Sequence, residues 1–264
     1  MKELKQSLFC RYKMKKSFKR AGVFDSGAGG LTVVKSLIRH KLFDEIIYYG
    51  DTARVPYGSK DSATIIRYAL EALEFFKNFD IDLMITACNS VSAYALLEIK
   101  DRAKFDVYGV IEPGILALKN ANLPLSSKIL ILGTKATIKS GLYQRGIFEL
   151  GFRDIKAIAT PLFVPIVEEG IFSGEVLQST LNYYLKSIAQ PDVVILGCTH
   201  FPLISKAIGD FFSNKPLLIH SGEAIAEYLE QNGYSKCSKD SSELKIFASE
   251  NPDGLKSIAK KWIY

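Results

Sequence analysis

The sequence predicts an α/β fold of two pseudo-symmetric α/β lobes, with mainly parallel sheets and a cleft between the lobes. Two observations predict it. Short apolar runs rich in Val and Ile alternate along the chain with segments of helical period, which is typical of βαβ units. Residues 81–90 also align with residues 191–200, which indicates an internal repeat. With 264 residues, 48% of them hydrophobic, the chain can fill one large or two medium cores.

The elements follow one another as strand, helix, strand. The runs with strand character are residues 21–24, 45–49, 82–87, 107–111, 128–132, 155–159, 192–196 and 216–219. The clearest helical segments are residues 31–40, 63–76 and 174–185. No Gly/Ser-rich or charged linker divides the chain, so we expect the two lobes to pack closely together.

The internal repeat places two cysteines in equivalent positions. Residues 81–90 (IDLMITACNS) align with 191–200 (PDVVILGCTH), and residues 23–27 (VFDSG) align with 131–135 (ILGTK). Ligands of open α/β sheets bind beyond the carboxyl ends of the strands, so both cysteines should reach one cleft. We expect residues 21–110 with 222–264 to form the first lobe and residues 111–221 the second.

The basic charge lies in one short N-terminal stretch. Residues 1–20 hold eight Lys or Arg and one acid, whereas the other residues hold 26 basic and 27 acidic groups. Because residues 21–264 are nearly neutral, they do not have the excess of basic residues that is typical of a nucleic-acid-binding fold, so no nucleic-acid partner is expected. We interpret residues 1–20 as a basic extension, favouring extra translated sequence ahead of a start at Met14 over a basic arm or a targeting segment.

The sequence predicts a cytoplasmic protein with free thiols and no membrane partner. Its longest uncharged run, residues 83–97, is shorter than the roughly 18 apolar residues of a membrane span. The cysteines Cys10, Cys88, Cys198 and Cys237 form no CxxC pair, and no export signal precedes them. Cys10 and Cys237 lie in polar surroundings without a partner in the repeat.

Polar neighbours distinguish Cys88 and Cys198 from ordinary core cysteines. Free Cys is most often a small buried hydrophobe, and this remains the alternative for each one alone. However, Asn89 and Ser90 follow Cys88, while Thr199 and His200 follow Cys198. Backbone amides and hydroxyls at a turn between strand and helix suit a carboxylate and also favour a thiolate.

Two loops of the first lobe should reach the same edge. Residues 25–30 (DSGAGG) follow a strand but match neither the Walker pattern nor GxGxxG, and an acid would repel phosphate. Asp25 therefore suits an ammonium group or a thiol partner, with Ser26 beside it. Tyr57 and Gly58 lie in a Pro/Gly loop after the second strand, where a simple ordered turn is the alternative.

Three further titratable residues are less informative. Glu168 interrupts the apolar run 161–167, where it either tunes a nearby base or begins a solvated helix. His40 and His220 have no partner at motif spacing, so we interpret both as structural. The thiols, acid and histidine together suggest proton transfer on the two faces of one carbon, as abstraction of an amino-acid α-proton requires.

Four motifs together resemble the bacterial glutamate racemases of the aspartate/glutamate racemase superfamily. They are residues 24–30 (FDSGAGG), 49–58 (YGDTARVPYG), 87–90 (ACNS) and 196–203 (LGCTHFPL), and the resemblance runs from about residue 21 to the C-terminus. It implies a racemase without cofactor or metal, a mechanism with two thiols, and a glutamate substrate. It further implies D-glutamate supply for peptidoglycan, cell-wall biogenesis and cell shape, and a homodimer.

The resemblance also implies a role for each site residue. Cys88 would act on the D-enantiomer and Cys198 on the L-enantiomer, supported by Asp25 and His200, with Glu168 assisting the second thiol. The implied substrate contacts are Asp25, Ser26, Tyr57, Gly58, Asn89, Ser90, Thr199 and His200. The family pattern Cys-Asn-Thr is Cys-Asn-Ser here, so Ser90 keeps the hydroxyl and lacks a methyl group.

Three alternatives remain open at the level of sequence. One is a racemase of the same superfamily acting on aspartate or another amino acid. Another is a zinc hydrolase that uses Cys88, Cys198 and His200 as ligands. The third is a two-lobed protein that binds an amino acid without catalysis. The sequence specifies neither the geometry of a dimer nor activation by a cell-wall precursor.

Overall fold

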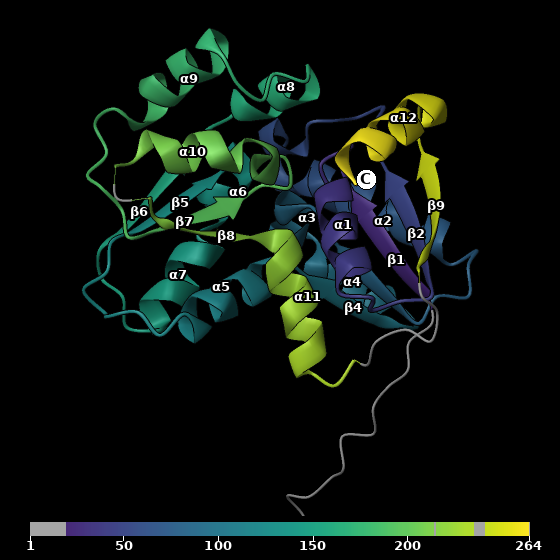
Figure 1. Ribbon diagram of the computed structural model, residues 1–264. Coiled ribbons are helices and arrows are strands. Elements are labelled where there is room, and N and C mark those ends of the chain that lie inside the picture. Colours follow the sequence, from purple (N-terminus) through teal and green to yellow (C-terminus); the bar gives the residue numbers. More distant parts are fainter. Residues whose placement is uncertain (1–19, 214, 235–240, 264) are drawn as a thin grey trace, which may run out of the picture.

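The computed structural model describes residues 20–213, 215–234 and 241–263, which form two parallel sheets side by side (Figure 1). The first sheet has the order β4-β3-β1-β2-β9 and the second the order β6-β5-β7-β8. Every strand pair among the described residues is parallel. The predicted α/β class with parallel sheets is therefore confirmed. Residues 1–19 of the expected extension, and Cys10 and Cys237, lie outside the described residues.

The strands agree with the predicted runs to within about two residues, with one addition. Their bounds are β1 Arg20–Asp25, β2 Glu45–Gly50, β3 Leu83–Thr86, β4 Asp106–Gly109, β5 Ile129–Gly133, β6 Ile155–Ala159, β7 Val193–Gly197, β8 Leu217–His220 and β9 Glu243–Ala248. Sequence analysis missed β9. It pairs only with β2, at the edge of the sheet, and its side chains are exposed or half-buried, so it lacks a continuous apolar run.

The two sheets repeat one arrangement. Within the first sheet the neighbours run β4-β3-β1-β2, and within the second they run β8-β7-β5-β6. β3 and β7 thus occupy equivalent positions, each beside the first strand of its own sheet. Because all strands are parallel, their carboxyl ends lie on one edge of each sheet. The turns after β3 and β7, which hold the two cysteines, are equivalent in the fold as well as in the sequence.

Helices cover the faces of both sheets (Figure 1). Their bounds are α1 Leu31–Arg39, α2 Ser62–Phe76, α3 Asn89–Tyr94, α4 Leu96–Arg102, α5 Ile111–Asn120, α6 Lys135–Ser140, α7 Leu142–Glu149, α8 Phe163–Glu168, α9 Glu175–Leu185, α10 Ser205–Phe211, α11 Ser221–Gln231 and α12 Pro252–Trp262. Local signals start several of them: the side chains of Asp61 and Thr134 cap the N-termini of α2 and α6. Within the described ranges, no helix has the length and apolar character to cross a membrane.

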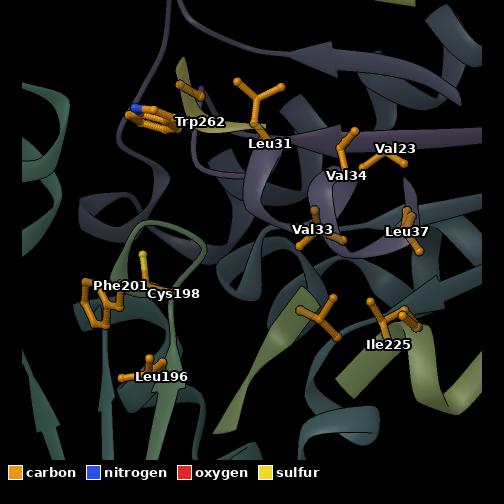
Figure 2. Close-up of a cluster of buried hydrophobic side chains, with 14 of the residues drawn as sticks. Val23, Leu31, Val33, Val34, Leu37, Leu196, Cys198, Phe201, Ile225 and Trp262 are labelled. Atoms are coloured by element: carbon orange, nitrogen blue, oxygen red, sulfur yellow. The ribbon is translucent and has the colours of Figure 1, made fainter. Parts of the chain in front are cut away.

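One hydrophobic cluster continues from one sheet to the other. Figure 2 shows Val23 of β1 and Val33 of α1 in the same cluster as Leu196 of β7. Ile225 of α11 belongs to it too, and α11 packs against α1. The two sheets are therefore held together by buried apolar surface, which keeps the facing edges in contact. The division into lobes at residues 110/111 and 221/222 stays a prediction.

Candidate active site

A small cavity lies where the two sheets meet, and side chains from both surround it. We call the part of the structure built on the first sheet the first half, and the part built on the second sheet the second half. The first half contributes Ser26, Val55, Pro56, Tyr57, Gly58, Cys88, Asn89 and Ser90, and the second contributes Thr134, Val164, Cys198, Thr199 and His200. Its volume is about 20 Å³, close to the room that one water molecule needs. The structure thus brings most of the residues singled out in the sequence to one place, and both thiols among them.

Each cysteine enters the cavity from the turn that follows a buried strand. β3 ends at Thr86, and Cys88 is the N-cap of α3. β7 ends at Gly197, directly before Cys198. Both thiols are free and both are 6% exposed. The strands fix where the two sulfur atoms lie, because their own residues are fully buried between helices.

A histidine and a carboxylate stand behind Cys198. The Nδ1 atom of His200 is 3.7 Å from the Cys198 sulfur, and its Nε2 atom is 3.0 Å from Oε1 of Glu168. Burial by itself lowers the pKa of His200, but the hydrogen bonds with Cys198 and Glu168 outweigh it and raise this pKa to about 10. His200 is therefore an imidazolium at neutral pH, and it puts a positive charge beside this sulfur.

The surroundings of Cys88 are neutral or negative. Its thiol donates to the hydroxyl of Ser26 at 3.6 Å. Burial, and secondly the Asp25 carboxylate, raise the pKa of Cys88 to about 12. Cys88 is therefore a thiol at neutral pH, and can supply a proton.

Asp25 lies behind the cavity rather than in its lining. Its side chain is fully buried, accepting from the hydroxyl of Thr199 at 3.2 Å and from the backbone N–H of Gly27 at 3.1 Å. Burial raises the pKa of Asp25, partly offset by the charge of His200. A Cβ on Gly29 would lie 2.4 Å from the Thr199 hydroxyl, so only glycine lets this loop approach the second cysteine turn.

Three hydroxyl groups gather at the end of the cavity near Gly58. The Ser90 hydroxyl is 2.9 Å from that of Thr134 and 3.4 Å from that of Thr137. A Cβ on Gly58 would lie 2.3 Å from Thr134, so the two halves meet closely here. Sequence reasoning did not select Thr134 as a site residue. The signal was present, because the repeat aligns Thr134 with Ser26.

Tyr57 is held at the cavity by side chains of its own loop, for which the sequence left a simple ordered turn as the alternative. Its hydroxyl donates to Oδ2 of Asp51, which also accepts from Nε of Arg54 at 2.6 Å. Burial and the Asp51 carboxylate raise the pKa of Tyr57, so its hydroxyl stays protonated. Asp51 and Arg54 therefore orient a residue of the lining, although neither lines the cavity itself.

The two histidines interpreted as structural lie elsewhere. His40 is 3.2 Å from Glu223 and 3.3 Å from Glu230, which joins α1 to α11. Burial and nearby Arg39 lower the pKa of His220 to about 4. Neither residue lines the cavity. Across the part of the chain that the structure describes, no three His, Cys, Asp or Glu side chains are grouped as a metal would require.

Comparisons with known proteins find similarity to racemases. The Asp/Glu/Hydantoin racemase family profile matches residues 32–229. The chain is 64% identical over 244 residues to a glutamate racemase of Nitratiruptor sp., covering 92% of this chain and 96% of the relative. It is also similar to the crystal structure of glutamate racemase from Campylobacter jejuni, with a TM-score of 0.90, 51% identity and coverage of 92% and 98%. The structure of Francisella tularensis glutamate racemase in complex with D-glutamate has a TM-score of 0.81, 30% identity and coverage of 93% of both chains.

Proposed function

Because the chain belongs to the Asp/Glu/Hydantoin racemase family, we propose that this racemase interconverts L- and D-glutamate by proton transfer between two cysteines, without a cofactor. The observation that carries the proposal is the cavity in which Cys88 and Cys198 meet from equivalent turns of facing sheets. Glutamate is favoured over aspartate by relatives such as those of Nitratiruptor and Campylobacter, and by the D-glutamate bound in the Francisella structure.

The proton transfers balance as follows. The Cys198 thiolate takes the α-proton of L-glutamate, so the Cα–H bond breaks while an S–H bond forms. The Cys88 thiol delivers its own proton to the opposite face of Cα, which gives D-glutamate and leaves a thiolate at Cys88. D-glutamate reacts by the same steps in reverse, beginning at Cys88. Proton exchange between the thiols and solvent restores the starting form.

The charges around the two sulfurs support these roles. The imidazolium of His200, 3.7 Å from Cys198, stabilises a thiolate there, and Glu168 holds that imidazolium in its charged form. The raised pKa of Cys88 keeps the opposite group a thiol until it has donated. An acid on one face and a base on the other is what racemisation at an unactivated α-carbon demands.

Polar groups in the lining suit the two carboxylates of the substrate. Ser26, Asn89 and Thr199, which flank the thiols, are suited to the α-carboxylate and the ammonium group, with Asp25 and His200 close behind. The hydroxyls of Ser90 and Thr134 lie together near Tyr57 and Gly58, where the distal carboxylate would accept from them. Glutamate has ten non-hydrogen atoms, and a cavity of about 20 Å³ does not hold them, so the two halves must part for it to bind.

The proposal extends to the place of the reaction in the cell. D-glutamate would be supplied to peptidoglycan synthesis, and thus to cell-wall biogenesis and cell shape, by a cytoplasmic homodimer. These features rest on the resemblance to bacterial glutamate racemases. A sedimentation measurement on the full chain tests the dimer: twice the mass of 29.4 kDa is expected, and a monomer at working concentration contradicts it.

The deciding experiment incubates the full chain with L-glutamate in deuterated water without added cofactor or metal. Optical activity and the α-proton signal are followed together. We expect optical activity to vanish as deuterium enters Cα. Loss of the signal from L-aspartate but not from L-glutamate would instead identify an aspartate racemase. No change with either amino acid in reduced, folded protein would favour binding without catalysis.

A parallel experiment with a metal chelator tests the remaining alternative, the zinc hydrolase. Racemisation that continues unchanged in the presence of a strong metal chelator is expected from two thiols alone. Activity lost with the chelator and restored by zinc would favour the hydrolase-like use of Cys88, Cys198 and His200 as ligands.

A further inference from the structure

One tyrosine connects the two cysteine turns. Tyr143 lies on α7 in the second half and is 1% exposed. Its hydroxyl donates to Oδ1 of Asn89 at 2.9 Å, and Asn89 directly follows Cys88. Its ring packs against Gly197, which directly precedes Cys198: a Cβ on Gly197 would lie 3.3 Å from Cε2 of Tyr143. A single side chain therefore contacts a neighbour of each sulfur-bearing residue.

The Asn89 amide is held at both ends. While Oδ1 accepts from Tyr143, Nδ2 donates to the Ser221 hydroxyl at 3.0 Å. Ser221 is the first residue of α11, the helix that packs against both α1 and α5. The Asn89 side chain is 2% exposed and lines the cavity. Its orientation, and with it the start of α3 at Cys88, is thus set by residues of other elements.

The position of Tyr143 is itself closely defined. A Cβ on Gly114 of α5 would lie 3.1 Å from its hydroxyl oxygen, so α5 leaves the phenol no free space on that side. Burial raises the pKa of Tyr143, which keeps the hydroxyl protonated. The phenol is therefore a rigid group that spans from the Cys198 turn to the Cys88 turn and retains its donor at working pH.

We propose that Tyr143 is a positioning residue for racemisation: its ring abuts the Cys198 turn, and its hydroxyl, through Asn89, holds the Cys88 turn at the separation that proton transfer needs. The inference rests on the function proposed above and adds a residue that does not line the cavity. Removing the hydroxyl while keeping the ring takes the hydrogen bond from Asn89 and leaves the ring packed against Gly197 of the Cys198 turn. The proton-transfer step at Cys88 should therefore slow more than the step at Cys198.

The test is Tyr143→Phe, read by deuterium isotope effects on kcat/KM with each α-deuterated enantiomer. In the proposed mechanism, Cys88 removes the deuterium of D-glutamate and Cys198 removes that of L-glutamate, so each effect reports its own step. We expect kcat/KM to fall about tenfold. The isotope effect with α-deuterated D-glutamate should rise relative to that with α-deuterated L-glutamate.

Two further variants sharpen the result. Ser221→Ala removes the other partner of the Asn89 amide, so it should shift the two isotope effects in the same direction by a smaller amount. Tyr234→Phe is the matched control, because it also removes a buried tyrosine hydroxyl, here 2.6 Å from that of Tyr108 and outside the cavity lining. It should leave both isotope effects and kcat/KM as in the parent.

The possible failures are distinguishable. An active parent whose ratio of isotope effects is unchanged by Tyr143→Phe, or moves towards the Cys198 step, overturns the inference alone. A purely structural role would lower the amount of active protein and leave that ratio unchanged, so it falls under the same outcome. A folded parent that does not racemise glutamate overturns the proposed function and the inference with it.

Discussion

The two cysteine turns occupy equivalent places in a repeated fold, yet their neighbours differ in charge. Cys88 follows β3 and faces Ser26, with the Asp25 carboxylate nearby. Cys198 follows β7 and faces His200, whose other nitrogen bonds Glu168. The comparison shows that repetition of the fold decides where the sulfur atoms lie, whereas residues that differ between the two copies, such as Asp25 and His200, decide which charges surround each sulfur.

The asymmetry gives the site a defined starting form. Cys88, a thiol whose pKa is raised, and Cys198, whose sulfur lies 3.7 Å from the His200 ring, have different electrostatic surroundings before any substrate binds. Two turns with identical neighbours would favour the same form of both sulfurs, whereas racemisation needs an acid on one face of Cα and a base on the other. Substitutions can remove first the sulfur atoms that the two turns share and then the neighbouring groups that distinguish the turns.

The largest expected effect comes from removing either sulfur. Cys88→Ala and Cys198→Ala should each reduce racemisation by at least about 10³-fold, since each face of Cα needs its own acid or base. The measurement is loss of optical activity of L- and D-glutamate, with thermal unfolding to verify folding. Cys237→Ala, a thiol replacement away from both turns in sequence, serves as control. Retained activity in either of the first two variants would end the two-thiol mechanism.

The next effect concerns the acid that joins the turns. Asp25→Asn should slow turnover about 10²-fold, a larger effect than its loss of stability, because the amide nitrogen that replaces one carboxylate oxygen cannot accept from Thr199 or Gly27 and the loop loses its position beside the thiols. Steady-state rates and urea unfolding measure the two parts. Asp61→Asn makes the same change at an exposed N-cap where Asn is equally suitable. An unchanged rate would show that Asp25 is only a turn residue.

A smaller effect tests what sets Cys198 apart. The pKa of His200 is raised above its ordinary value, so its imidazolium is present below about pH 10 and is lost as pH rises through that value. Activity should decline along this alkaline limb. Glu168→Gln removes one of the groups that raise this pKa, so the limb should move to lower pH, with turnover at neutral pH about tenfold lower.

The control for this pH profile is the adjacent acid. Glu169→Gln removes the same charge one residue later, at the C-cap of α8, whereas the carboxylate bonded to His200 is that of Glu168. Its alkaline limb should coincide with that of the parent. A limb that does not move in Glu168→Gln would mean that Glu168 does not govern the charge of His200.

The smallest effect is expected where this chain departs from the family pattern. Ser90→Thr restores a methyl group and keeps the hydroxyl that contacts Thr134, so kcat/KM should stay within about threefold of the parent. Ser90→Ala removes the hydroxyl, and should raise KM for glutamate clearly more than Ser90→Thr does. Equal behaviour of the two variants in glutamate kinetics would remove Ser90 from the proposed binding of the distal carboxylate.

Much of the fold was predictable because central strands such as β3, β5 and β7 are buried on both faces. The continuous apolar runs within residues 128–132 and 192–196, which each follow one charged residue, leave little ambiguity, and both ranges lie within two residues of the observed strands. The exception, β9, alternates charged and apolar residues at an edge, so its sequence does not differ from that of a surface segment. Pairing with β2 identifies it as a strand, and this is a long-range contact.

The sequence alone was sufficient to select most of the residues that line the cavity, because strand ends carry the polar groups and the repeat aligns Cys88 with Cys198. It was not sufficient for the roles of groups that act through a neighbour. Thr134 at the cavity and Tyr143 behind it come from separate elements, and their hydroxyls meet Ser90 and Asn89 only after the two halves have packed together.

The protein's sequence by itself therefore determined the class of fold, the succession of strands and helices along the chain apart from β9, and the candidate residues for proton transfer, because these depend on local apolar pattern and on chemistry carried by single side chains. The tertiary structure alone decided which thiol has its pKa raised by burial and which sulfur lies beside an imidazolium. That difference depends on burial and on charges such as Asp25, His200 and Glu168 within a few ångströms, and such distances arise only when segments far apart in the chain fold against each other.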